Sequence, residues 1–117
     1  MGTENTENLV KEVVNVISDK KGQDTVVLKI GDINPITDYM IITSGDVPVH
    51  TRAIADEIIK TLKDKGIVHS HVEGYSEGRW IVIDYGDIMV HIFLPELREY
   101  YELERLWQDA PRVEIKE

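Results

Sequence analysis

The stretch that most constrains the fold is Trp80–Pro95, WIVIDYGDIMVHIFLP, in which Gly86-Asp87 separates two apolar, β-branched runs. This pattern predicts a β-hairpin with a two-residue turn. If Tyr85 pairs with Ile88 across that turn, the register decides which side chains share a face, because neighbouring side chains on a strand point to opposite sides. The hairpin therefore has two faces whose composition can be read directly from the sequence.

These two faces differ in chemistry. The first is almost wholly aliphatic and is expected to lie under helices, where burial of each large side chain contributes about 1.5–3 kcal/mol. It consists of Ile81, Ile83, Tyr85, Ile88, Val90 and Ile92. The second, which we call the outer face, mixes large hydrophobic side chains with a carboxylate and an imidazole. It consists of Trp80, Val82, Asp84, Met89, His91 and Phe93.

The outer face is either covered by packing that tolerates polar groups or offered to a partner. Trp, Phe and Met are the residues that protein interfaces favour at their centres. Trp80, whose expected neighbour is Phe93, is the largest apolar side chain on this face. We therefore interpret Trp80 as an interface anchor.

Charge narrows the class of partner. The 117 residues contain 22 Asp and Glu against 13 Lys and Arg, a formal charge of −9 at pH 7. This balance argues against a general nucleic-acid binder, which needs a basic surface, and favours a basic protein partner or simple solubility. The chain has no cysteine, which excludes disulfides and thiolate metal sites. The polar, acidic start and the lack of a long apolar run indicate a cytoplasmic protein that does not enter membranes.

The rest of the chain alternates helix and strand signals. Apolar residues at helical spacing from Leu9 to Ile17 predict an amphipathic helix that Asn5 or Thr6 caps. Two strands are expected next, over Thr25–Ile30 and Tyr39–Thr43, followed by a helix from about Val49 to Lys65 with Asp46 as its cap. A strand near His71–Glu73 then precedes the hairpin. Pro95 opens a last helix, whose apolar and aromatic residues are Leu97, Tyr100, Tyr101, Leu103 and Trp107.

This order predicts one α/β domain over residues 1–117, with a mixed sheet of about five strands flanked by helices. The flexible parts are expected at the ends, about residues 1–5 and 112–117.

Several of these stretches, taken together and in order, carry a family resemblance. They are Thr37–Ile42 with Gly45, His50 and Ala53–Glu57 in one half, and Glu73-Gly74, Trp80–Phe93 and Tyr101–Trp107 in the other. This joint pattern resembles the ribosomal silencing factor family, also called Iojap-like proteins, and the likeness covers nearly the whole chain. The sequence departs from the family pattern at Asp46–Val49, where small polar residues and an Arg or Gln usually precede the histidine.

The resemblance implies a nucleotidyltransferase-like fold without catalytic residues, no enzymatic activity and no cofactor. It also implies a partner, the large-subunit ribosomal protein number fourteen, and a steric mechanism: the bound factor blocks joining of the two subunits and lowers translation when nutrients are short. We expect the partner to contact the outer face and the turn of the hairpin, through Trp80, Asp84, Asp87, Met89, His91 and Phe93.

A nucleotidyltransferase-like enzyme or nucleotide-binding protein is the main alternative. Asp84 and Asp87 are the carboxylates that could form a metal-binding or acid–base pair, but they lie three residues apart across a turn and cannot share a strand face. Ser44 also precedes Gly45, whereas such an enzyme needs the reverse order. We therefore expect Asp87 to shape the turn and Asp84 to meet a cation of the partner.

The four histidines suggest no strong metal site. His69 and His71 would share a strand face, but no third ligand is near in sequence. His50 starts a helix, where a neutral imidazole can bond the preceding turn, and His91 is expected opposite Val82. Structural or interface roles are favoured for all four. A homodimer formed through the outer face is a further alternative when the protein is free.

Overall fold

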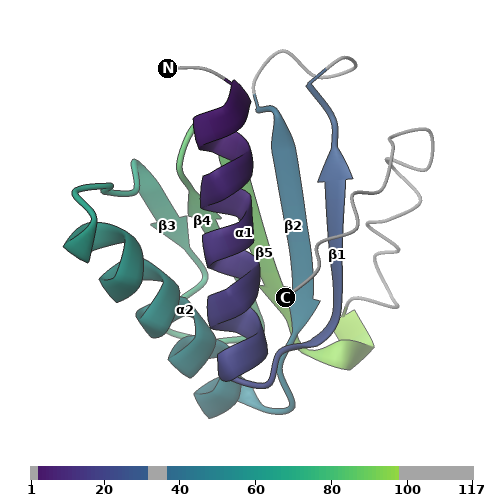
Figure 1. Ribbon diagram of the computed structural model, residues 1–117. Coiled ribbons are helices and arrows are strands. Elements are labelled where there is room, and N and C mark those ends of the chain that lie inside the picture. The colour runs from purple at the N-terminus through teal and green to yellow at the C-terminus, as the bar shows by residue number, and fades with distance from the viewer. Residues whose placement is uncertain (1–2, 32–36, 98–117) are drawn as a thin grey trace.

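Two helices cover one face of a five-stranded sheet (Figure 1). The computed structural model describes residues 3–31 and 37–97. Its elements are α1 (Thr3–Asp19), β1 (Gln23–Lys29), β2 (Tyr39–Ser44), α2 (Pro48–Asp64), β3 (His71–Glu73), β4 (Trp80–Asp84) and β5 (Ile88–Phe93). The strand order is β1-β2-β5-β4-β3, with β2 and β5 parallel and the other neighbours antiparallel. The predicted α/β domain with a mixed five-stranded sheet is confirmed.

Helix α1 has the predicted apolar stripe, since Val10, Val13 and Ile17 are all buried against the sheet. The helix begins at Thr3, so the prediction that Asn5 or Thr6 caps it is wrong. No glycine or proline interrupts residues 3–9, and the helix therefore extends through this polar segment.

None of the helices in the described ranges is both long and apolar enough to span a bilayer.

Helix α2 begins one residue earlier than predicted and uses a different cap. Pro48 occupies its first turn, and Val47 is the N-cap, without a side-chain hydrogen bond. The prediction of Asp46 as N-cap is therefore wrong. The Asp46 side chain is engaged elsewhere, because its Oδ1 accepts a hydrogen bond from the Gln23 side-chain amide at 2.5 Å. The helix ends close to the predicted Lys65, and Gly66 lies just beyond it at a φ of 83°, a backbone conformation that favours glycine.

The hairpin has the predicted register. Trp80 lies opposite Phe93, and the Tyr85 N–H donates to the Ile88 carbonyl at 2.9 Å, which closes a two-residue turn. Gly86 takes the left-handed conformation of this turn, with a φ of 85°.

The hairpin turn is shaped by a different carboxylate from the one predicted. The expectation was that Asp87 would take positive φ or bond the turn with its side chain, but Asp84 Oδ1 accepts the Gly86 N–H at 2.8 Å. Asp87 contributes its carbonyl oxygen instead, which accepts the N–H groups of Asp38 and Tyr39 at 2.9 and 3.0 Å. The turn is thereby tied to the start of β2.

The aliphatic face of the hairpin forms the centre of the core, as expected. Its five aliphatic side chains are fully buried and pack with residues of α1 and α2, while Tyr85 is half-buried at the margin. Strand β2 is buried at every residue, and its nearly continuous apolar sequence is typical of a central strand covered on both faces.

Part of the sequence prediction concerns segments outside the described residues. A helical turn begins at Pro95, as predicted, and the description ends at Leu97. The remainder of the expected last helix, with Tyr100, Tyr101, Leu103 and Trp107, lies outside the described residues. So do the expected flexible residues 1–2 and 112–117, whereas residues 3–5 belong to α1.

Truncation of the aliphatic face is expected to destabilise the fold. Ile83 and Val90 are both 0% exposed, and Ile83→Ala should lower the free energy of unfolding by about 2–5 kcal/mol, Val90→Ala by less, because each leaves a cavity. Urea denaturation measures these losses. Val68→Ala is the control, since Val68 is 68% exposed and its truncation removes little packing. Equal stability of Ile83→Ala and the wild type would contradict the assigned faces.

Candidate functional site

The candidate site is the outer face of the hairpin, on the side of the sheet away from α1 and α2. Strand pairing aligns Trp80 with Phe93, Val82 with His91, and Asp84 with Met89. Directly opposite residues of paired strands share a face. The structure thus brings together five of the six residues predicted to bind a partner and places Asp87 in the adjoining turn.

Three aromatic rings form a stack at one end of this face. The Trp80 and Phe93 rings lie 4.9 Å apart between centroids, with an interplanar angle of 29°. The His91 ring is nearly parallel to that of Phe93, at 9° and 5.9 Å. The Trp80 indole N–H also donates to His91 Nδ1 at 3.1 Å. Stacking and the hydrogen bond together hold the indole in a defined orientation.

The outer face is only partly open. Phe93 is 0% exposed and His91 6% exposed, so the expectation that both lie on an open face is wrong. The reason is a second small core on this side of the sheet, in which Phe93 packs with side chains from β1 and β2. Its buried members are Leu28, Ile30, Met40, Ile42 and Phe93, with Val26, Trp80 and Leu97 against them.

The accessible part of the face lies over β4 and the neighbouring edge of the sheet. Trp80, Val82 and Asp84 of β4 are half-buried there, as is Met89 on the adjacent β5, so each presents some surface to solvent. These side chains combine apolar area with one carboxylate. This arrangement can bind a partner that offers apolar groups and a cation.

Strand β3 adds residues that the sequence analysis did not assign to the site. It pairs His71 with Asp84 and Glu73 with Val82, which extends the outer face by one exposed strand. His71 Nε2 and Glu73 Oε1 lie 2.9 Å apart. In the sequence, the polar residues His71 and Glu73 on either side of Val72 indicated that both lie on one face of a strand. Only the β3–β4 pairing shows that this face adjoins Asp84. The β3–β4 side of the outer face therefore carries two carboxylates, those of Asp84 and Glu73.

His91 is held in its neutral form. Burial lowers its pKa from 6.5 to about 4. Because Nδ1 accepts the indole N–H, the ring proton sits on Nε2, which has no hydrogen-bond partner among the described residues. If Nδ1 were protonated, both it and the indole nitrogen would be N–H donors, and the hydrogen bond that orients Trp80 would be lost.

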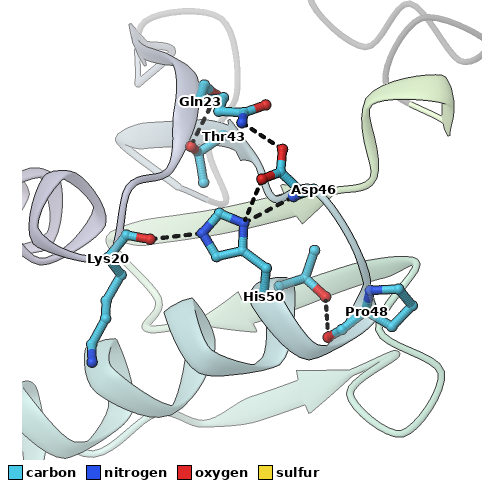
Figure 2. Close-up of polar contacts among 7 residues, drawn as sticks. Lys20, Gln23, Thr43, Asp46, Pro48 and His50 are labelled. Carbon is cyan, nitrogen blue, oxygen red and sulfur yellow. Dashed lines mark hydrogen bonds and ion pairs between the residues drawn. The ribbon is translucent and has the colours of Figure 1, made fainter.

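The other histidines contact neighbouring groups. His50 bonds the turn before α2 through Nδ1, as predicted, and its Nε2 lies 2.7 Å from the Lys20 carbonyl (Figure 2). His69 packs edge-on against the Tyr85 ring, with centroids 6.4 Å apart. Within residues 3–31 and 37–97, no group of three or more His, Asp or Glu side chains is arranged to hold a metal ion.

A hollow of about 360 Å³ on the helix side of the hairpin turn is poorly suited to nucleotide phosphates. Its charged lining consists of Lys65 against two carboxylates, Glu12 and Asp87, and Lys65 already lies 3.8 Å from Glu12. Burial raises the pKa of Tyr85, which also lines the hollow, to about 12, so its phenol stays neutral. This chemistry gives little support to the nucleotidyltransferase alternative.

Titration of His91 is expected to make the fold acid-sensitive. Its pKa is lower in the folded than in the unfolded chain, so its contribution to stability is complete above pH 6.5 and is lost progressively as pH falls towards about 4. The full loss corresponds to about 3 kcal/mol. Denaturation at pH 7 and pH 4.5 should therefore show a larger drop in stability for the wild type than for His91→Gln, which does not titrate. Identical drops would contradict the buried neutral imidazole.

Comparisons with known proteins agree with this architecture. The family described as "Ribosomal silencing factor during starvation" matches residues 3–117. The "Ribosomal silencing factor RsfS" of Halalkalibacterium halodurans is 40% identical over 110 residues, 94% of each chain. A mouse protein named "Mitochondrial assembly of ribosomal large subunit protein 1" is 32% identical over 98 residues, 81% of this chain and 43% of that one. A crystal structure of a Chromobacterium violaceum protein superimposes with a TM-score of 0.85 at 31% identity, covering 87% of this chain and 85% of that one. The chain therefore belongs to the ribosomal silencing factor family.

Proposed function

We propose that this protein binds the large ribosomal subunit through ribosomal protein number fourteen, using the outer face of its hairpin. The bound protein occupies the surface that the small subunit needs, so that subunits do not join and translation falls when nutrients are limiting. It acts in the cytoplasm as a binding factor without a cofactor. Family membership supports the ribosomal role, and the name of the mouse relative, which refers to the large subunit, supports the choice of subunit.

The observation that carries the proposal is the partly exposed Trp80, held in place at one end of a mixed apolar and acidic face. The stack on Phe93 and the hydrogen bond to His91 orient the indole before any partner arrives. An anchor ordered in advance loses less conformational entropy on binding. Trp at such positions commonly contributes 2 kcal/mol or more to binding.

The charges around Trp80 support a basic partner. Asp84 and Glu73 lie along the open side of the face, and Asp87 is exposed in the adjoining turn. The whole chain carries a formal charge of −9. Complementary potentials speed encounter with a positively charged surface, and ribosomal proteins are typically basic.

Direct measurement of subunit binding tests the proposal. The protein should co-sediment with separated large subunits and not with small subunits. Sedimentation of the free protein, in the same buffer, separates this function from self-association, because a second copy could cover the same half-apolar face.

Replacement of Trp80 is expected to weaken large-subunit binding by about thirtyfold or more, the equivalent of about 2 kcal/mol. Trp80→Ala also removes packing against Phe93 and should lower the melting temperature, so binding is measured well below the transition. Tyr75→Ala is the matched control, because Tyr75 is an exposed aromatic residue on the β3–β4 connection. Undiminished binding of Trp80→Ala would show that the partner uses another face.

The Asp84→Asn variant tests the negative charge of Asp84 separately from its role in the hairpin turn. The variant keeps an oxygen that can accept the Gly86 N–H but removes the negative charge. We expect weaker binding to the large subunit with an unchanged melting temperature, since the contact with a basic partner loses one carboxylate. A lower melting temperature with full binding would assign Asp84 to the turn alone.

The salt dependence of binding should distinguish protein from RNA as the main contact. An acidic surface that meets a basic protein releases few counterions, so affinity should fall with salt less steeply than for a protein that neutralises about six phosphates. Titration at several salt concentrations gives the slope. A slope as steep as that of about six phosphate contacts would contradict a protein partner.

A further inference from the structure

We infer that the partner-binding surface continues from Trp80 around the end of the sheet onto the β2–α2 loop, where Val47 and Val49 contact the same basic ribosomal protein. This inference rests on the proposed function and adds a second contact region to it. Its evidence is independent of the aromatic stack: two exposed valines, a loop held rigidly in place, and a continuous backbone path from that loop to Trp80.

The two valines are unusually open for their residue type. Val47 is 52% exposed and Val49 70% exposed, and they flank Pro48 at the start of α2. Isolated apolar side chains on a surface need no explanation, but two around one proline form a small apolar projection. Neither side chain contributes much to the core, so their apolar area is available to a partner.

The loop lies next to the aromatic stack. The Gly45 N–H donates to the Phe93 carbonyl at 2.9 Å, which joins the start of the loop to the end of β5. On the other side, Thr51 Oγ1 donates to the Gly78 carbonyl at 2.5 Å, two residues before Trp80.

Gly78 allows this close approach. A Cβ atom at this position would lie 2.9 Å from Pro48 Cβ, and the residue has a φ of 68°, a conformation that favours glycine. The backbone of the β3–β4 connection therefore packs directly on Pro48. The chain that leads to Trp80 is thus in direct contact with the loop that carries the valines, which supports one partner surface covering both.

A network of polar contacts fixes the shape of the loop (Figure 2). His50 joins it to the end of α1, since Nδ1 accepts the Asp46 N–H and Nε2 lies 2.7 Å from the Lys20 carbonyl. The Gln23 side-chain amide donates to Asp46 Oδ1 at 2.5 Å. Because Nδ1 accepts the Asp46 N–H, Nε2 is the ring nitrogen that donates to the Lys20 carbonyl. The valines are consequently presented on an ordered loop, which reduces the entropy lost on binding.

Charge favours the same basic partner here as on the hairpin. The exposed carboxylates near this end of the sheet belong to Asp46, Glu77 and Glu96, against the guanidinium groups of Arg52 and Arg79. Arg52 Nη1 donates to the Ser76 carbonyl at 3.2 Å, which engages that cation within the protein. The local balance is acidic, as is the chain as a whole.

The test is large-subunit binding by the full chain carrying Val47→Ser and Val49→Ser together. We expect affinity to fall about tenfold while the melting temperature stays within about 2 °C, because both side chains are exposed and serine is a favourable N-cap at position 47. Val68→Ser is the matched control. Val68 is 68% exposed and follows the other end of α2, a helix about 25 Å long.

The outcomes separate this inference from the proposed function. Wild-type binding by the double variant, with binding lost in Trp80→Ala, would overturn the loop contact and leave the proposed function standing. Equal losses in the double variant and in Val68→Ser would also overturn it, since the effect would then not be specific to the loop. A loss in the double variant with full binding by Trp80→Ala would overturn the continuity of the two regions. Full binding by all three variants would overturn both the loop contact and the use of the outer face, and absence of large-subunit binding by the wild type would contradict the proposed function itself.

Discussion

The parallel pairing of β2 with β5 is the contact on which the rest of the structure depends. It joins the α1-β1-β2 half of the chain to the β3-β4-β5 half, with a register that runs from Tyr39 opposite Ile88 to Ser44 opposite Phe93. Hydrogen bonds close the pairing at both ends, where the Asp87 carbonyl accepts the N–H groups of Asp38 and Tyr39 and the Phe93 carbonyl accepts that of Gly45. Because parallel strands need a crossover rather than a tight turn, α2 lies between them in sequence and returns over the sheet.

This pairing gives the hairpin two different neighbours. Its aliphatic face meets both helices and becomes the main core. Its outer face meets only the smaller cluster from β1 and β2, which reaches Phe93 and Trp80 but leaves β4 and β3 partly open. The same strands thus stabilise the fold on one side and present a binding surface on the other. A rigid sheet is a suitable support for such a surface, since it holds the contact residues in register.

Polar groups hold the segments of this surface in position. His91 is buried and neutral, and one of its nitrogens orients Trp80. Asp84 closes the hairpin turn with one oxygen while its side chain remains partly exposed. His50 plays a comparable part at the other end of the sheet, where it orders the β2–α2 loop. Each of these contacts orders a segment that faces outward, which reduces the entropic cost of binding a partner.

The sequence by itself determined the local elements: the alternation of side chains in Trp80–Phe93 and the glycine in its turn specify the hairpin and the composition of its faces, because both depend on near neighbours. The sequence pattern was also sufficient to identify the family to which the chain belongs. Caps and exposure depended on contacts distant in sequence. Asp46 was available as a cap, but pairing with Gln23 and His50 engaged it elsewhere. Phe93 was assigned correctly to the outer face, yet only the strands β1 and β2, more than 45 residues earlier, decided that it is buried there. Whether a side chain on a sheet is covered depends on what packs across that face, and periodicity along one strand carries no information about it.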